Sequence, residues 1–269
     1  MKQYLTYLLL FLASSGAFAQ SDNKPVKISH AEPLYIDLIR DLGARKGEKE
    51  INVGWIMEDQ NTFITQSGFA EFEFSPVNRL GLEVEVPFRF SHTIRPDHTD
   101  EVIPKDKVEG VKMAAQYTFL VSPKNQLSAA LGSIYEINLH SYATFRKTRS
   151  LVKGNTFNPF LIVAKKWGAV NTLLYTGPSY YQQFNSEVRE FNYQVNLSMH
   201  YVLPSSNFIG VELNHETSGK QKITVIHPQI KVKIASGLAI GFATGIPVNV
   251  KTQSLSFLTR LIYEPGRKK

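Results

Sequence analysis

The sequence of 269 residues contains no cysteine. This absence excludes disulfides, thiol catalysis and acylation of an N-terminal cysteine, so backbone pairing and packing must stabilise the fold. Beyond residue 20 there is also no apolar run close to the roughly 20 residues that a membrane-spanning helix requires. If the chain is embedded in a membrane, it must therefore cross that membrane with strands.

Motifs for common cofactor chemistry are missing as well. The seven histidines show no H-x-H or H-E-x-x-H spacing, and no glycine-rich phosphate-binding pattern is present. We therefore expect no metal site, no catalytic motif of these classes and no cofactor. The formal net charge of +7 indicates a basic surface, which in an exported protein would meet lipid phosphates or anionic solutes rather than nucleic acid.

The N-terminus carries the pattern of an export signal. An apolar run from Tyr4 to Phe18 follows Lys2, and Ala17-Phe18-Ala19 is a small-x-small cleavage pattern. We expect residues 1–19 to be a signal peptide, which would place the mature chain outside the cytoplasm.

Alternating side chains dominate the rest of the sequence. Between Phe191 and Tyr201 every second residue is apolar, and the intervening residues are Asn192, Gln194, Asn196, Ser198 and His200. Such a strand fits both a soluble sandwich and a transmembrane barrel. The pattern predicts twelve strands, with residues 157–181 alternating least clearly. Their expected ranges are 50–58, 63–75, 80–91, 108–122, 126–138, 155–166, 169–182, 189–203, 207–217, 222–233, 237–247 and 252–264.

The lengths of the connections favour the barrel. After every second strand the chain has a short, turn-like connection, at residues 75–79, 122–125, 167–168, 204–206 and 235–237. The long, charged connections, residues 92–107 and 139–154, fall at the opposite end. This distribution is typical of a membrane barrel with periplasmic termini. We predict an all-β fold, a twelve-stranded antiparallel transmembrane β-barrel over residues 50–264, with a basic tail at residues 265–269.

Aromatic residues support this prediction. They fall toward strand ends on faces predicted to point outward, where membrane barrels carry interfacial girdles. These residues are Phe72, Phe74, Phe88, Phe90, Tyr117, Phe119, Tyr135, Phe191, Tyr193, Tyr201, Phe208 and Tyr263.

Residues 20–49 precede the barrel and are expected to form a periplasmic N-terminal segment. Pro33 and Gly43 suit the two ends of a short helix, whose apolar stripe would be Leu34, Leu38, Ile39 and Leu42. This helix could enter the barrel mouth or lie on its rim, and both placements stay open.

The polar strand faces predict the lining of the lumen. The expected lumen residues are Glu71, Glu73, Glu83, Glu85, Arg89, Lys112, Gln194, Asn196, His200, Glu212 and Arg260. Neighbouring carboxylates repel one another unless cations compensate them. We expect compensation by the lumen cations, either alone or joined by Arg40, Arg45 or Lys46 of the N-terminal segment. The set would control charge selectivity or only hold the wall together.

One stretch offers an enzymatic alternative. Asn214-His215-Glu216-Thr217-Ser218-Gly219 resembles the His-x-Ser segment of outer-membrane phospholipase A, a twelve-stranded barrel with a lipid-facing His, Ser and Asn. The resemblance implies that His215 is the base and that Thr217 replaces the serine nucleophile. The partner Asn has no counterpart, because Gln229 on the next strand is predicted to point inward.

A broader resemblance covers the mature chain. The stretch from His30 to Glu48, with Gly245-Ile246-Pro247 and the stretch from Arg260 to Pro265, resembles outer-membrane barrels similar to the meta-pathway phenol-degradation family. This resemblance implies a barrel that acts as a passive channel, and it transfers no functional residues.

These observations predict an outer-membrane channel or uptake protein for small solutes, with hydrophobic and anionic solutes both open. A lipid hydrolase and a structural barrel without transport are the alternatives. The expected partners are outer-membrane lipids and lipopolysaccharide, besides a small solute, and the oligomeric state stays open. Lipopolysaccharide phosphates would contact the basic loop residues Arg146, Lys147, Arg149 and Lys153.

Overall fold

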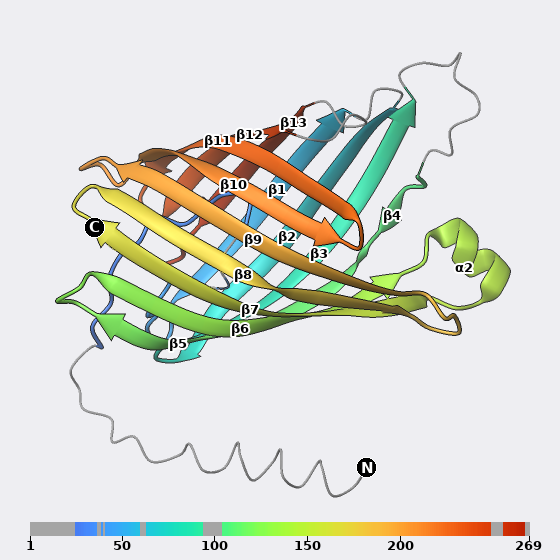
Figure 1. The fold of residues 1–269 in the computed structure, drawn as a ribbon, viewed down its shortest axis with the longest axis horizontal. Coiled ribbons are helices and arrows are strands. Elements are labelled where there is room, and N and C mark those ends of the chain that lie inside the picture. The colour runs from blue at the N-terminus through green and yellow to red at the C-terminus, as the bar shows by residue number, and fades with distance from the viewer. Residues whose placement is uncertain are drawn as a thin grey trace, which may run out of the picture.

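A single antiparallel sheet closes on itself in the computed structural model, which describes residues 25–36, 39, 41–59, 63–93, 104–248 and 255–266. Strand β1 (Lys49–Asp59) pairs with β2 (Phe63–Val77) on one side and with β13 (Ser256–Tyr263) on the other (Figure 1). The predicted twelve-stranded antiparallel barrel is confirmed. The predicted signal peptide lies outside the described residues, as do residues 267–269 of the predicted tail.

The remaining strands follow one another around the barrel in chain order. They are β3 (Leu80–Thr93), β5 (Gly110–Ser122), β6 (Leu127–Leu139), β7 (Val152–Trp167), β8 (Val170–Gln183), β9 (Arg189–Val202), β10 (Phe208–Ser218), β11 (Gln221–Ala235) and β12 (Leu238–Pro247). Strand β4 (Lys107–Val108) adds only a two-residue pairing to β3. The predicted strands therefore match the observed ones to within a few residues.

The long connections lie at one rim, as the sequence predicts, and one of them contains helix α2 (Tyr142–Thr148) (Figure 1). The other rim has only short turns, but the two-residue turn of Gly219 and Lys220 between β10 and β11 lies at the rim of the long connections. Gly168 (φ 65°) and Gly237 (φ 71°) form two of the tight turns in left-handed conformations that glycine adopts without steric penalty. No helix within the described ranges is long and apolar enough to cross a membrane.

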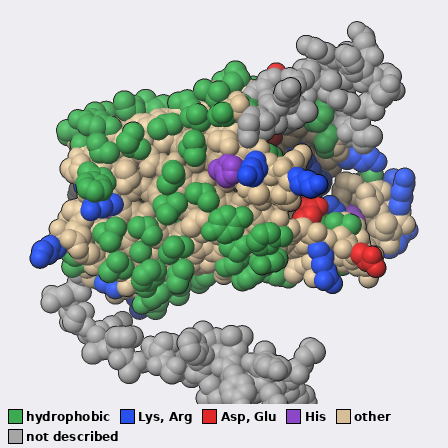
Figure 2. All heavy atoms as spheres, viewed as in Figure 1, with side chains coloured by type: hydrophobic (Ala, Val, Ile, Leu, Met, Phe, Trp, Pro, Cys, Tyr) green, Lys and Arg blue, Asp and Glu red, His purple; other side chains and the backbone are tan. Residues whose placement is uncertain are grey.

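The outer wall of the barrel is apolar. Along β13 the side chains of Leu258, Arg260 and Ile262 are buried, while Phe257 and Leu261 are exposed. Figure 2 shows hydrophobic side chains spread over the outer wall, with most charged side chains toward its two ends. This is the surface that a barrel presents to lipid.

Phe208 is an exception to the predicted aromatic girdle. Its side chain is only 1% exposed and points into the barrel. A period of two places Phe208 on the same face of β10 as Glu212, which is fully buried inside. The prediction of an outward Phe208 was therefore wrong.

The prediction of a helix from Pro33 to Gly43 was also wrong for the residues that the structure describes. Leu34, Tyr35 and Ile36 form a bend, and Leu42–Gly43 is a turn, while residues 37, 38 and 40 lie outside the described part. The backbone N–H groups of Leu34, Tyr35 and Ile36 bond to side chains of the barrel wall. The wall therefore supplies the acceptors that this non-helical stretch needs for its buried N–H groups.

Candidate functional site: an occupied barrel lumen

The N-terminal segment runs through the inside of the barrel and does not rest on its rim. We call its described residues 25–36, 39 and 41–44 the plug segment. Leu34, Leu42 and Ala44 are each at most 2% exposed, although the segment belongs to no strand or helix. Such burial requires that the surrounding wall satisfy the segment's backbone polar groups.

The wall supplies these partners from several strands. Asn171 Oδ1 of β8 accepts a hydrogen bond from the Ala31 N–H at 3.2 Å, and Thr118 Oγ1 of β5 accepts one from the Gly43 N–H at 2.9 Å. Both acceptors are side chains that point inward and are almost fully buried. The wall thus binds the backbone of the plug segment at Ala31 and at Gly43.

The central contact is made by Glu212 and Gln229. Gln229 Oε1 accepts from the Leu34 N–H at 2.7 Å, and Glu212 accepts from the N–H groups of Tyr35 and Ile36 at 3.3 and 2.9 Å. Gln229 Nε2 also donates to Glu212 Oε2 at 3.1 Å. We call Glu212 and Gln229 the latch. Bonds to a buried carboxylate are stronger than neutral ones, so the latch is a principal attachment of the plug segment.

Apolar contacts fix the plug segment on opposite sides. Leu34 packs with Phe208, Ala243, Leu258 and Ile262. Ile39 and Leu42 instead pack with a second cluster whose wall members are Ala114, Ala130, Phe160, Ile162, Ala164, Leu173 and Tyr175. Burial of an aliphatic side chain contributes about 1.5–3 kcal/mol, so these anchors add substantially to the latch.

Two further wall residues beside the latch, Gly241 and His227, contact Leu34 and Tyr35 of the plug segment. A Cβ atom on Gly241 would lie 2.5 Å from Leu34 Cδ2, so a larger residue at this position of β12 would displace the leucine side chain. The Tyr35 ring stacks on His227 with ring centroids 4.0 Å apart. The wall is therefore shaped to this particular segment.

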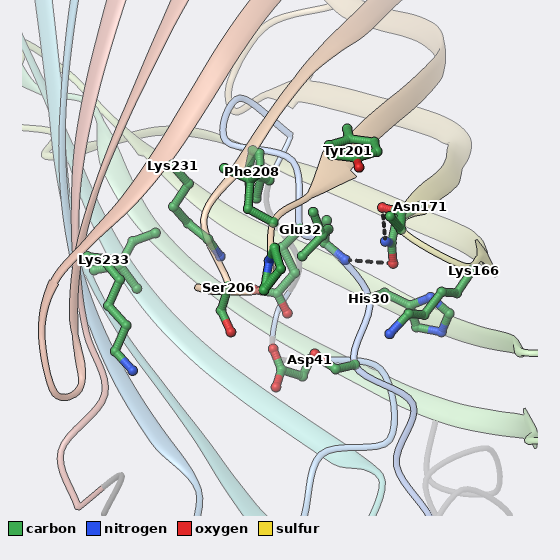
Figure 3. Close-up of a pocket in the computed structure, with 18 of the residues that line it drawn as sticks. His30, Glu32, Asp41, Lys166, Asn171, Tyr201, Ser206, Phe208, Lys231 and Lys233 are labelled. Atoms are coloured by element: carbon green, nitrogen blue, oxygen red, sulfur yellow. Dashed lines mark hydrogen bonds between the residues drawn. The ribbon is translucent and has the colours of Figure 1, made fainter. Parts of the chain in front are cut away.

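The plug segment divides the interior into two main cavities. One has a volume of about 520 Å³ and is bordered by the tight turns at Gly168, Ser206 and Gly237; we call it the mouth cavity (Figure 3). The other, of about 400 Å³, lies in the half nearer the long connections and is called the vestibule. Tyr35, Ile36 and Ile39 of the plug segment form part of the vestibule lining.

The vestibule contains much of the acidic set predicted from the sequence. Carboxylate oxygens of Glu71, Glu83 and Glu85 lie within 4.8 Å of one another. Arg260 forms an ion pair with Glu71 and approaches Glu73 at 3.9 Å, and Lys112 Nζ lies 2.9 Å from Glu85. These three carboxylates are the group best suited to hold a metal ion. Arg260 and Lys112 already supply positive charge beside them.

The other basic residues that were considered as partners of these glutamates have different contacts. Arg89 pairs with Glu109 at 3.1 Å, away from the acidic group. Arg45 Nε donates to the Pro25 carbonyl, and the Lys46 N–H bonds to Asn78 at the tight-turn rim. Within the described residues no ion pair joins Arg45 or Lys46 to these glutamates, and Arg40 lies outside the described part of the chain. The plug segment enters the barrel mainly through backbone and apolar contacts.

The remaining predicted lumen residues occupy three different places. Gln194 lines the vestibule and donates to Asn158 at 3.1 Å, whereas Asn196 lies beneath the plug segment beside Ile36. His200 is buried with its ring 4.4 Å from that of Phe208. Asn52, which sequence reasoning missed, donates to Glu50 and Glu73. The predicted set is thus distributed along the interior and does not form one site.

The enzymatic alternative has a defined geometry on the outer wall. His215 and Thr217 lie on the face of β10 opposite to Glu212, and Thr217 Oγ1 is 3.3 Å from His215 Nε2. His215 Nδ1 is 2.9 Å from Thr224 Oγ1 on β11, the strand that corresponds to the one with the asparagine in the phospholipase. A hydroxyl, an imidazole and a second hydroxyl therefore form a hydrogen-bonded chain.

Comparison with known proteins identifies the family. A family model described as HAEPLYID-like matches residues 26–264. The chain belongs to the HAEPLYID-like family. The letters of that description are the sequence of residues 30–37, and residues 30–36 belong to the plug segment. The more specific resemblance to the meta-pathway phenol-degradation family is not confirmed by this match.

Solved structures of outer-membrane barrels share the fold of this HAEPLYID-like chain. An outer-membrane channel from Pseudomonas putida F1 is 11% identical with a TM-score of 0.65, covering 83% of this chain and 98% of that one. The NanC porin (9%, TM-score 0.55) and the KdgM porin (16%, TM-score 0.52) each align over 80% of this chain and 98% of their own. No curated protein sequence matches the chain.

Proposed function

We propose that this HAEPLYID-like protein is a passive channel for small solutes in the outer membrane, closed in the present conformation by its plug segment. The observation that carries the proposal is the plug segment itself, which separates two cavities inside a closed barrel. A purely structural barrel needs no such cavities. The barrel fold shared with solved channels and porins supports the proposal.

The orientation and the solute are part of the same proposal. Short turns face the periplasm in barrels of this class, so the mouth cavity would open to the periplasm and the vestibule to the exterior. A narrow twelve-stranded lumen suits solutes of low molecular mass. The inward-facing charges of the vestibule would then discriminate among solutes by charge.

Engineered disulfides test whether the plug segment closes the channel. In the double variant Leu34→Cys/Gly241→Cys the two sulfurs would lie within reach, because a Gly241 Cβ would be 3.2 Å from Leu34 Cγ. Since the chain has no other cysteine, the cross-link is unambiguous. We expect negligible single-channel conductance in a planar bilayer when the pair is oxidised and opening events after reduction.

A matched disulfide within the wall serves as the control. Thr244 and Phe257 face each other on the outer faces of β12 and β13, so Thr244→Cys/Phe257→Cys links two strands away from the plug segment. This variant should conduct equally before and after reduction. Equal conductance of the oxidised and reduced plug variant would reject the plug as a gate, and no conductance in any variant would favour a structural barrel.

Lipid hydrolysis is the second candidate function, favoured only by the contacts of His215. If Nε2 accepts a proton from the Thr217 hydroxyl, Nδ1–H can donate to Thr224 and hold the imidazole in place. Release of fatty acid from phospholipid vesicles by the wild type and its loss in His215→Ala would support this activity. No hydrolysis by the wild type would exclude it.

The membrane partners follow from the apolar outer wall and from helix α2. Arg146, Lys147 and Arg149 are exposed at the long-connection rim, within reach of lipopolysaccharide phosphates if that rim faces outward. Neutralising Arg146 and Lys147 together should weaken binding of lipopolysaccharide to the purified protein. Unchanged binding would remove this contact from the proposal.

A further inference from the structure

The mouth cavity combines three lysines from two strands. Lys231 and Lys233 extend from β11 on one side, and Lys166 of β7 lies on the other beside His30 (Figure 3). Within the described residues no ion pair joins any of these lysines to a carboxylate. Lys231 Nζ instead lies 5.1 Å from the centroid of the Phe208 ring. Their charge is therefore available to a ligand.

The carboxyl groups in the cavity compensate this charge only in part. Asp41 is ion-paired with Lys27 of the plug segment, which also pairs with Glu48. Burial and the neighbouring Asp41 carboxylate raise the pKa of Glu32 well above its ordinary value, which favours the neutral acid. Glu264, the third carboxyl group, follows the end of β13 at the rim.

Two buried polar atoms of the plug segment lack partners in the described structure. His30 donates or accepts at Nε2, where Ser128 Oγ lies 2.9 Å away, but its Nδ1 has no partner. Glu32 Oε1 is likewise buried without a hydrogen bond. Such atoms are usually satisfied by water or by a ligand, and both residues line the mouth cavity.

Apolar residues complete the lining. Phe208, Leu238 and Ile262 face the same cavity, whose volume of about 520 Å³ is typical of small-molecule sites. A ligand with one apolar face, several hydroxyl groups and a negative charge would use all three kinds of surface. An uncharged solute would leave the lysines unused, and a cation would be repelled by them.

We propose that the mouth cavity is a binding site for a small hydroxylated organic carboxylate. Its carboxylate would lie among Lys166, Lys231 and Lys233, its hydroxyl groups would bond to His30 Nδ1 and Glu32 Oε1, and its apolar face would cover Phe208. The assignment deepens the proposed function, since it rests on that function for the claim that the bound carboxylate is a solute of the channel.

Equilibrium binding to the full-length protein in detergent tests the site. The probes are D-glucuronate, D-glucose, which lacks the charge, and propionate, which lacks the hydroxyl groups. We expect calorimetry to show the tightest binding for D-glucuronate and a fall in its affinity with rising salt. Equal binding of D-glucuronate and D-glucose would overturn the proposal, as would equal binding of D-glucuronate and propionate.

Neighbouring lysines of one strand provide a matched control. Lys166→Gln and Lys231→Gln should each weaken D-glucuronate binding about tenfold, the loss of one charge-assisted contact. Lys165→Gln should bind like the wild type, because Lys165 points outward, over the Trp167 ring at 4.0 Å. A loss as large in Lys165→Gln as in Lys166→Gln would contradict a local site.

The outcome is separable from that of the channel. Binding in detergent does not require conduction, so D-glucuronate binding by a non-conducting barrel would retain the site and reject the channel. Conduction without D-glucuronate binding would retain the channel and reject the site.

Discussion

The two sides of the barrel interior satisfy their polar groups in different ways. On β10 and β11 the latch residues Glu212 and Gln229 bond to the backbone of the plug segment. Near β2, β3 and β13 the glutamates are instead compensated within the wall, by Arg260 and Lys112. On the latch side the wall therefore bonds directly to the plug segment, whereas the ion pairs of the acidic side join wall residues to one another. Changes on the two sides should consequently affect different properties of the protein.

The largest effect is expected from Arg260→Gln. This change leaves Glu71 buried without the guanidinium with which it is paired. Loss of one partner of a buried ion pair typically costs about 3–5 kcal/mol. We expect a clear fall in the midpoint of thermal unfolding, measured in detergent by circular dichroism, without selective release of the plug segment.

A second substitution separates the ion pair from a packing effect. In Arg260→Gln/Glu71→Gln neither group is charged, so much of the lost stability should return. If the double variant unfolds at the same temperature as the single variant, the loss came from the shape of Arg260 and not from its charge.

Glu212→Gln should act on the plug segment and leave the barrel intact. The amide retains the size of the side chain but removes the charge and one of the two acceptors used by Tyr35 and Ile36. A hydrogen bond to a charged group contributes about 1.5–3 kcal/mol. In a Leu34→Cys background we expect a thiol reagent to label residue 34 roughly tenfold to a hundredfold faster, with little change in barrel melting.

Glu216→Gln is the matched control for this experiment. Glu216 lies four residues after Glu212 on the same inward face and lines the vestibule without a hydrogen bond to the described plug residues. Its substitution should leave the labelling rate of Leu34→Cys unchanged. If both substitutions accelerate the labelling to a similar extent, the total negative charge of the lumen, and not the latch, holds the plug segment.

The barrel could be predicted from the sequence because its outer wall follows one regular pattern. Lipid requires an apolar outer face on every strand, so period-two alternation predicts both the strands and their inward positions. The rule weakens at residues 157–181 for a reason that the structure explains. The inward residues Phe160, Ile162 and Leu173 are apolar because they pack against Ile39 and Leu42 of the plug segment. Poor alternation was thus a sign of an occupied lumen.

The plug segment could not be predicted from its own residues. Leu34, Ile39 and Leu42 recur with helical spacing, but they are buried against two separate wall clusters and not against one surface. The wall residues that bind the backbone, Asn171 and Gln229 among them, look like any polar lumen residue in the sequence. Only the closed barrel brings residues 31–36 to acceptors more than a hundred positions away.

The smallest expected effect concerns pH and also distinguishes the two sides. Burial, with the positive charge of Lys166 nearby, lowers the pKa of His30 to about 4 from an ordinary value near 6.5, although Asp41 partly opposes this shift. As pH falls from 6.5 toward 4, a released plug segment takes up a proton that the bound segment does not, so binding of the segment weakens. Glu32 acts in the opposite sense, because its raised pKa favours the bound state as pH falls.

The contribution of His30 is therefore isolated by comparing Leu34→Cys labelling with and without His30→Gln at each pH. Between pH 7 and 5 we expect the ratio of the two rates to rise a few-fold, whereas a constant ratio would mean that His30 keeps its ordinary pKa in the bound segment.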